Sequence, residues 1–143
     1  MVEVSFYVLQ SQSAKERYLF ACKLIEKIYR SGHACYVLTD SLEQSQALDD
    51  LLWTFRAGSF IPHQLYTGEP PQLEKVMLIG TIAAPEDWKK ILVNLSSQYP
   101  EDFQQCERIL QILDGSAETK ELARNRYRRY QQSGAAITTH IIA

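Results

Sequence analysis

Short apolar runs alternate along the chain with segments that carry apolar residues at helical spacing. Five runs rich in β-branched, aromatic and aliphatic residues predict strands, at residues 4–9, 34–38, 76–79, 108–113 and 136–142. The run at 34–38 has no polar alternation, which is typical of a strand buried on both faces of a sheet. A sixth run at 90–95 also predicts a strand, although a short helix beginning at Glu86 is an alternative for this segment.

Capping residues and helical spacing predict three main helices. They extend from Ser13 to Ser31-Gly32, from a cap within 39–41 to Phe55, and from about Ser116 to Ser133, with Gly134 closing the last. Ser13 and Glu16 have the spacing of a capping box, in which a hydroxyl and a carboxylate satisfy free amides. In the second helix, four apolar residues share one face: Leu48, Leu51, Leu52 and Phe55.

Two further segments are less regular. Residues 56–71 contain two glycines and three prolines and are predicted as a loop with one short extended piece at Phe60-Ile61. Pro100 suits a first helical turn, so residues 101–106 are predicted as a brief helix. The alternation of strands and helices, without a repeat or linker, predicts one α/β domain over residues 1–143: three layers around a mostly parallel central sheet.

A doubly wound sheet favours a nucleotide enzyme, and the loop after the first strand is where such enzymes hold phosphate. This loop, residues 10–13, contains no glycine, and its side chains would obstruct the close approach of phosphate to backbone amides. Asp40 follows the second strand and could imitate a ribose-binding acid, but without the glycines a helix cap is the better interpretation. The sequence therefore predicts no nucleotide-binding loop.

Other catalytic patterns are missing from the sequence. It contains no Gly-x-Ser-x-Gly elbow, and the histidines at 33, 63 and 140 have no recognisable partner pattern. His63 follows a proline in a loop and is interpreted as structural. Adjacent acids at 49–50 and 86–87 would diverge by about 100° on a helix and are interpreted as solvated surface. No catalytic residue, cofactor or metal site is predicted.

The three cysteines, Cys22, Cys35 and Cys106, form neither an even set nor closely spaced pairs. This pattern argues against a disulfide framework or a zinc site and predicts buried free thiols in a reducing cytoplasm. The first residues lead into an apolar run without the basic start of a signal peptide, and no apolar run approaches the ~20 residues that span a bilayer. We therefore expect a soluble cytoplasmic protein that does not bind membranes.

Composition adds a feature that the hydrophobic pattern does not show. The 143 residues include 15 Lys and Arg against 17 Asp and Glu, a net charge of −2, so the field of the whole molecule does not attract nucleic acid or membranes. Residues 120–129, however, contain five cations and one acid and carry +4, whereas the rest of the chain carries −6. A basic segment within an acidic protein is a first indication of a binding site.

On a helical wheel the basic segment separates into two faces. The predicted packing face holds Leu122, Ala123, Arg126 and Tyr130. The other face holds Lys120, Arg124, Arg128 and Gln131, and Tyr127 lies at the border. Such a border suits a small ligand with an apolar side chain and a carboxylate, because the ring offers contact area and guanidinium groups donate paired hydrogen bonds. A solvated basic face is the plainer alternative, and nucleic acid is a rival ligand that these few charges would hold weakly at physiological salt.

Trp53 marks a second candidate surface. It points about 140° away from the apolar face of its helix, so it is either covered by the following loop or exposed to a partner. Phe60-Ile61 follow seven residues later and can form one apolar patch with Trp53. The sequence alone leaves both interpretations open.

Four groups of residues resemble the chi subunit of bacterial DNA polymerase III holoenzyme. They are Val4-Ser5-Phe6-Tyr7-Val8-Leu9, the spaced Leu48-Asp49-x-x-Leu52-Trp53, the motif Ser59-Phe60-Ile61-Pro62-His63, and Leu122-Ala123-Arg124-x-Arg126-Tyr127-Arg128-x-Tyr130 followed by Gly134. The resemblance runs nearly end to end. Trp53 in combination with the Ser-Phe-Ile-Pro-His motif is its specific part.

The resemblance implies an accessory protein of the clamp-loader complex, with a Rossmann-like fold that has lost nucleotide binding. Proteins of this family bind the acidic, hydrophobic C-terminal tail of single-stranded-DNA-binding protein and so reach DNA only indirectly. By motif, the tail site would comprise Arg124, Tyr127 and Arg128, with Leu113 as a candidate apolar floor; Arg128 stands where the family also has Lys. Trp53 and Phe60 match the aromatic positions that join chi to the psi subunit, a face that a helicase can occupy instead.

Two other functions stay open at this point. A relict α/β enzyme for a phosphorylated small molecule would bind ATP or a dinucleotide. Direct single-stranded DNA binding through the basic helix would give affinity for naked oligonucleotide.

Overall fold

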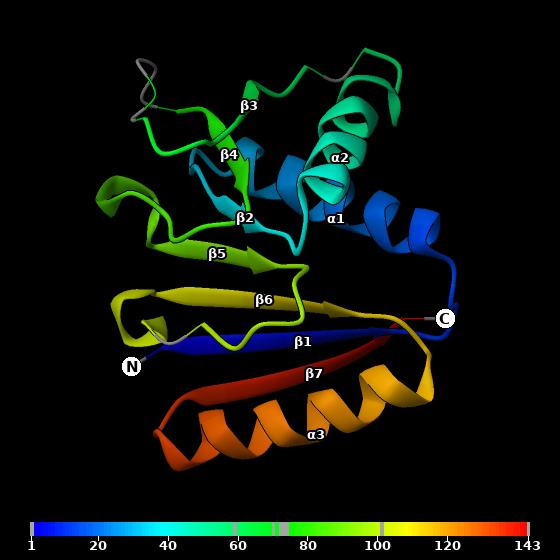
Figure 1. The fold of residues 1–143 in the computed structure, drawn as a ribbon, viewed down its shortest axis with the longest axis vertical. Coiled ribbons are helices and arrows are strands. Elements are labelled where there is room, and N and C mark those ends of the chain that lie inside the picture. The colour runs from blue at the N-terminus through cyan, green and yellow to red at the C-terminus, as the bar shows by residue number, and fades with distance from the viewer. Residues whose placement is uncertain (1, 59, 70, 72–74, 101, 143) are drawn as a thin grey trace.

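The computed structural model describes residues 2–58, 60–69, 71, 75–100 and 102–142. Within them, one seven-stranded sheet has the order β3-β4-β2-β5-β6-β1-β7 (Figure 1). All neighbouring strands are parallel, so the sheet expected to be mostly parallel is parallel throughout. The strands are β1 Glu3–Leu9, β2 Tyr36–Leu38, β3 His63–Leu65, β4 Met77–Gly80, β5 Ile91–Asn94, β6 Arg108–Leu113 and β7 Ala136–Ile142.

Three α-helices in the described part of the chain cover the two faces of this sheet: α1 (Ala14–Arg30), α2 (Leu42–Thr54) and α3 (Ala117–Gln132). The connections from β1 to β2 and from β6 to β7 run in opposite directions across the sheet. Because crossover connections between parallel strands are right-handed, helices on such opposed connections lie on opposite faces. Accordingly α1 and α2 pack against one apolar cluster and α3 against the other, which confirms the three-layer α/β prediction.

The predicted helix ends are confirmed. Ser13, Ser41 and Ser116 are the N-caps, and each hydroxyl accepts a hydrogen bond from the backbone N–H three residues further on. After α1 and α3 the chain turns at Gly32 and Gly134, whose φ angles are +87° and +83°. Glycine adopts this left-handed backbone conformation without the steric penalty of a Cβ atom, and it stops both helices.

Two local predictions were wrong. Asp40 is not a helix cap: Ser41 caps α2, and the Asp40 carboxylate accepts hydrogen bonds from the backbone N–H and hydroxyl of Ser97 at 2.9–3.0 Å. The short extended piece expected at Phe60-Ile61 is displaced to β3, where His63 pairs with Met77. Pairing with β4 decides the position of this strand, and it leaves Phe60 outside the sheet.

Two 3₁₀ helices lie on the face of the sheet that α3 covers. The first, η1 (Glu86–Trp88), precedes β5, so the segment for which helix and strand competed contains both. The second, η2 (Phe103–Gln105), takes the place of the brief helix predicted over 101–106. The predictions also included Ser59, Pro70 and Glu101, which lie outside the described residues.

The three cysteines are buried free thiols, as predicted. Burial raises the pKa of Cys22 and Cys35 to about 12 and that of Cys106 to about 11. Because the thiolate is the reactive form, these side chains act as small core residues rather than as nucleophiles.

Candidate functional site

Packing of α3 against the sheet separates its basic residues into two environments. Arg126 and Tyr130 are 2% and 0% exposed, and Leu122 and Ala123 are half-buried, which confirms the predicted packing face. The opposite face is exposed and holds Lys120, Arg124, Arg128 and Gln131. The helix therefore presents a basic outer face although its inner face also contains an arginine.

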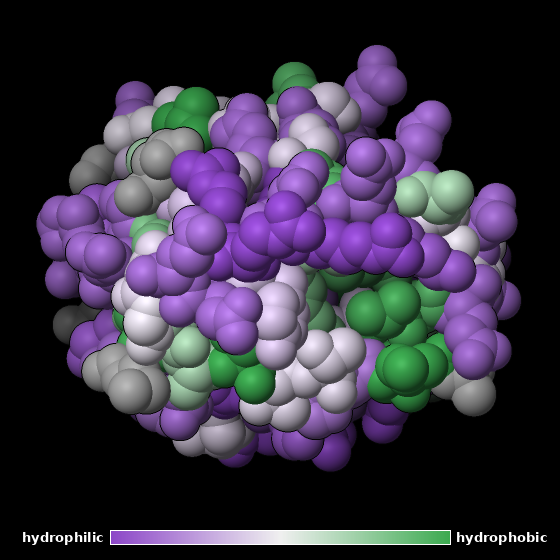
Figure 2. All heavy atoms as spheres, turned by 90° about the horizontal axis from the view of Figure 1, so that it is seen from below, coloured by the Kyte–Doolittle hydropathy of each residue, from purple (hydrophilic) through white to green (hydrophobic). Residues whose placement is uncertain are grey.

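Tyr127 lies on the rim of a groove between α3 and the sheet. Its ring centroid is 6.0 Å from that of Phe6 on β1, and the residue remains 41% exposed. The groove has a volume of about 350 Å³ and is lined by Phe6, Val8, Ala123, Arg124, Tyr127, Arg128, Gln131 and Thr139. Figure 2 looks onto this end of the molecule and shows a band of strongly hydrophilic atoms across it, beside a hollow with paler and apolar walls.

The groove brings together three of the four residues proposed for this site by resemblance. Arg124, Tyr127 and Arg128 line it, whereas Leu113 does not: Leu113 is 3% exposed and packs in the apolar cluster beneath α3. The floor comes instead from Phe6 and Val8. Alternation along β1 indicates that these two residues share a face, but the sequence does not reveal that β1 lies beside β7 under the open side of α3.

The cations on the rim have no acidic partner. Within the described residues, no ion pair involves Lys120, Arg124 or Arg128. Arg124 and Arg128 also border a polar depression of about 580 Å³ on the outer side of α3, together with Lys120. Two guanidinium groups and an ammonium group are thus free to meet an anionic ligand that crosses from the groove onto the helix.

Arg126 holds α3 to the sheet from inside. Its Nη1 donates hydrogen bonds to Oε1 of Gln111 at 3.1 Å and to the carbonyl of Ser96 at 3.3 Å, and Gln111 in turn donates to the hydroxyl of Tyr130. Its Nε and Nη2 have no protein partner among the described residues. Burial lowers the pKa of Arg126, so this charge is held at an energetic cost. The network orients the helix whose other face forms the groove.

Trp53 and Phe60 form an exposed aromatic pair at a distant part of the surface. Their ring centroids are 5.7 Å apart, and they are 52% and 67% exposed. The loop after α2 therefore lies beside Trp53 rather than over it. The sequence left open whether Trp53 is covered by the following loop or exposed to a partner. In the structure Trp53 is exposed and forms an apolar patch with Phe60.

His63 supports this pair from below. Its ring lies 4.6 Å from that of Trp53, its Nδ1 lies 2.7 Å from the carbonyl of Ile61, and its Nε2 lies 3.1 Å from the carbonyl of Asp49. The structural role predicted for His63 is confirmed. Asp49, expected on the solvated surface, is also engaged: its carboxylate is 3.4 Å from Nε2 of His63, and burial raises its pKa.

The place where a Rossmann-type sheet would hold phosphate is filled by protein. The N–H of Gly115 donates to the carbonyl of Ser11 at 2.9 Å, and a Cβ atom on Gly115 would lie only 2.4 Å from the carbonyl oxygen of Gln10. From α1, the Arg17 guanidinium donates to the carbonyl of Ile112, near the end of β6, and to that of Leu95, the residue after β5. These contacts close the carboxyl edge of the sheet around β1, in agreement with the missing glycine-rich loop.

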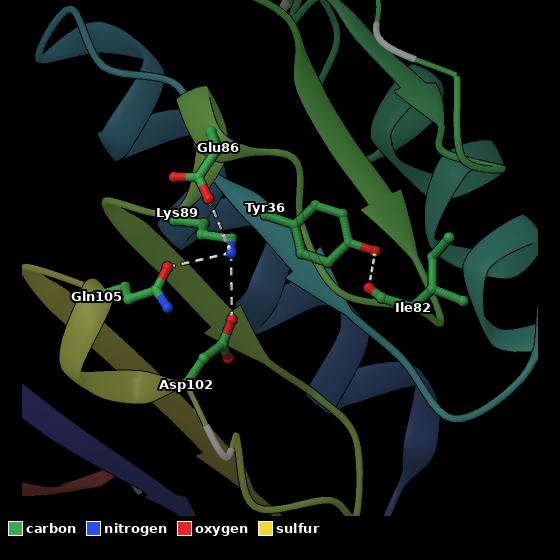
Figure 3. Close-up of polar contacts among 6 residues, drawn as sticks. All are labelled: Tyr36, Ile82, Glu86, Lys89, Asp102 and Gln105. Carbon is green, nitrogen blue, oxygen red and sulfur yellow. Dashed lines mark hydrogen bonds and ion pairs between the residues drawn. The ribbon is translucent and has the colours of Figure 1, made fainter.

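A third hollow, of about 330 Å³, lies between the two 3₁₀ helices and the ends of β2 and β5. Figure 3 shows Lys89 reaching from the end of η1 toward Glu86, Asp102 and Gln105, with its Nζ at 3.4, 3.5 and 3.1 Å from their oxygens. Nearby, the Tyr36 hydroxyl donates to the carbonyl of Ile82. The charge of Lys89 is therefore already compensated, and its contacts tie the two 3₁₀ helices together.

In the part of the chain that the structure describes, no cluster of His, Cys, Asp or Glu side chains is arranged to hold a metal ion. No helix there is both long enough and apolar enough to cross a membrane.

The fold and its surfaces define the class of protein. It is a parallel α/β protein of Rossmann-like fold in which the usual phosphate site is closed, and its candidate binding surfaces are the groove at α3 and the aromatic pair beside α2. The crystal structure of T4 UvsW shares the fold, with a TM-score of 0.70 and 11% identity. The match covers 99% of this chain and 41% of that one, and at this low identity it shows the fold alone.

Sequence comparison gives the family. Residues 1–138 match the family model of the DNA polymerase III chi subunit, HolC. The chain is 29% identical to the DNA polymerase III subunit chi of Pseudomonas aeruginosa, over 98% of this chain and 96% of that protein. It is 25% identical to the corresponding subunit of Escherichia coli, over 97% of both chains. The chain therefore belongs to the DNA polymerase III chi subunit family, which confirms the resemblance seen in its motifs and assigns it to DNA replication.

Proposed function

We propose that this protein is an accessory subunit that tethers DNA polymerase III to single-stranded-DNA-binding protein. It binds the acidic C-terminal tail of that protein in the α3 groove and connects it to the clamp loader through psi. In this proposal it has no catalysis or cofactor of its own, reaches DNA only through its protein partners, and works in the cytoplasm.

The groove beside Tyr127 is the observation that carries the proposal. A cavity of about 150 Å³ is sufficient for a benzene ring, so the 350 Å³ between Phe6, Val8 and Tyr127 accommodates an aromatic side chain and its backbone. Arg124 and Arg128 lie on the same rim and can donate charge-assisted hydrogen bonds to a terminal carboxylate. A peptide that ends in an aromatic residue, with acids before it, satisfies both the apolar floor and the basic rim.

The exposed pair of Trp53 and Phe60 is the proposed site for psi, or for a helicase on the same face. Large aromatic residues dominate the binding energy of protein interfaces when they become buried in a partner. The buried His63 contacts the Trp53 ring and holds it beside Phe60, so the two rings present one apolar surface to a partner. The pair comes from α2 and the loop after it, whereas the groove belongs to α3, so both partners can bind at once.

The proposal is tested with a fluorescent acidic peptide that ends in Pro-Phe with a free carboxylate, titrated in fluorescence anisotropy. We expect micromolar affinity that weakens as salt rises, because the rim contacts are exposed charges. Amidating the terminal carboxylate, or replacing the terminal Phe by Ala, should each reduce binding at least tenfold. Equal affinity for all three peptides would contradict the proposed site.

A pair of variants controls for net charge. Arg124→Ala removes a rim donor and should weaken binding by about tenfold, within the range of charged hydrogen bonds. Lys23→Ala removes one charge from the exposed surface of α1, far from the groove, and should leave the affinity unchanged. Binding of an oligonucleotide of the same length, without peptide, would favour direct DNA binding instead.

A further inference from the structure

The sheet ends in an open strand at β7. It is the last strand in the sheet order, and no described residue forms a backbone ladder with its outer side. Five of its seven residues are exposed, and its sequence Ala136–Ile142 contains neither charged residues of the Lys, Arg, Asp or Glu type nor proline. Natural edge strands usually carry such residues to prevent pairing with another chain. An edge without them is available for an added strand.

The register with β1 defines which backbone groups are free. The N–H of Ala136 donates a hydrogen bond to the carbonyl of Val2, and the carbonyl of Ile142 accepts one from the N–H of Gln10. The even-numbered residues of β7 therefore form the backbone hydrogen bonds to β1. Because successive residues of a strand direct their backbone groups to opposite sides, those of Ile137, Thr139 and Ile141 point outward. These three residues offer three N–H donors and three carbonyl acceptors in a row.

The open edge adjoins the α3 groove. Thr139 lines that groove and also lies at the centre of the outward row. It pairs with Phe6, so its side chain is on the same face of the sheet as the groove floor. Since threonine is small, a side chain from a strand added outside β7 can pass over it into the groove.

Charge indicates what kind of strand fits. The helix α3 precedes β7 and returns along it, so the two elements lie side by side in opposite directions (Figure 1). Lys120, Arg124 and Arg128 follow one exposed side of this helix at intervals of four residues, without acidic partners in the described part of the chain. An extended chain on the β7 edge would run beside this basic row, which favours a negatively charged peptide.

The same charges disfavour a second copy of this chain. Two β7 strands paired antiparallel would be related by a two-fold axis normal to the sheet, with both α3 helices on one face. Their basic rows would then approach each other across the new pair of strands, and like charges repel.

We propose that an acidic peptide seated in the groove continues along β7 as an eighth strand, bonded to Ile137, Thr139 and Ile141. This inference rests on the proposed function of the groove and adds the way in which the rest of the peptide is held. Adding a strand to an exposed sheet edge lets backbone hydrogen bonds supply affinity while pockets beside the edge supply specificity. Binding would then depend on the length of the peptide as well as on its last residue.

Amide hydrogen exchange by NMR, with and without a saturating acidic peptide of eight residues ending in Pro-Phe, tests the proposal. We expect slower exchange at the amides of Ile137, Thr139 and Ile141, and little change at Thr138 and His140, which already bond to β1. Resonance shifts around Tyr127 without this alternating protection would overturn the edge proposal and leave the groove proposal standing. Absence of any shift would remove both. Protection of the same three amides that grows with protein concentration, without peptide, would assign the edge to a second copy and overturn the proposal.

A variant gives a second measurement. Ile141→Pro removes one outward N–H but none of the bonds to β1, and Ile141 does not line the groove. The eight-residue peptide should bind it about five- to tenfold more weakly, as expected for one lost hydrogen bond. Ile141→Ala removes the same side chain but keeps the N–H, so it is the matched control and should bind that peptide more tightly than Ile141→Pro. A terminal dipeptide that reaches only the groove should not distinguish Ile141→Pro from Ile141→Ala. Equal affinity of both variants for the long peptide would refute the added strand.

Discussion

Replacing Tyr127 by alanine is the most direct test of how the groove binds. A tyrosine buries about 200 Å² when it packs completely, and Tyr127 is 41% exposed, so roughly 80 Å² is available to a ligand at ~25 cal/mol per Å². This corresponds to about 2 kcal/mol if the ligand covers the whole ring, or about 30-fold in Kd. We expect the acidic peptide ending in Pro-Phe to bind Tyr127→Ala more weakly by up to this factor.

The matched control is Tyr127→Phe, which keeps the ring and removes only the hydroxyl. It should bind within about twofold of the wild type, because the argument depends on the apolar area of the ring. Both variants should be examined by anisotropy and by thermal unfolding, since the ring also contacts Phe6 inside the groove. Unchanged affinity of a folded Tyr127→Ala would refute the assignment of this ring to the binding surface.

Four further predictions concern other parts of the molecule. Trp53→Ala should abolish capture of a psi-type partner while leaving peptide affinity unchanged, which a pull-down and anisotropy on the same preparation would show. Gly115→Ala should lower the free energy of unfolding by about 2 kcal/mol in urea titrations, because its Cβ would lie 2.4 Å from a backbone carbonyl; an unchanged midpoint would contradict the closed edge described above. Burial tends to raise the pKa of Asp114, but hydrogen bonds from Ser116 and Thr119 at the start of α3 outweigh it and lower the pKa overall. The stabilisation from this carboxylate is therefore complete above the unfolded pKa and is lost as pH falls through the lower folded pKa. Asp114→Asn should be less stable than the wild type at neutral pH, and the two should converge in acid. A thiol reagent at pH 8 should modify the three cysteines much more slowly in the native protein than in denaturant, and fast labelling of the native protein would show that the thiols are accessible.

Much of the fold could be predicted because its signals are local. The hydroxyl caps at Ser13, Ser41 and Ser116, and the turns at Gly32 and Gly134, depend on residues within one turn of the helix end. The apolar runs that became β1, β6 and β7 are long enough to show strand character without knowledge of their neighbours. The strand that the sequence misplaced is β3, which has three residues and whose position depends on pairing with β4 rather than on a local pattern.

The candidate sites divide in the same way. Helical period was sufficient to place Arg124, Tyr127 and Arg128 around one border of α3 and to bury Arg126 and Tyr130. The identity of the floor required the strand order, since Phe6 and Val8 are more than a hundred residues away from α3 in sequence. The assignment of Leu113 to the floor was wrong because it did not take the strand order into account. The structure places Leu113 in the core beneath the helix.

Residue type and short-range spacing are sufficient to predict the α/β class, the helix boundaries, the absence of a glycine-rich phosphate loop and the position of the basic segment. The three-dimensional structure is needed to show which strand lies under α3, that the loop after α2 leaves Trp53 and Phe60 exposed together, and that β7 ends the sheet with an open edge. These features depend on contacts between segments that are distant in sequence. The hydrophobic pattern indicates whether a residue is buried or exposed, but it does not indicate which segment the residue packs against.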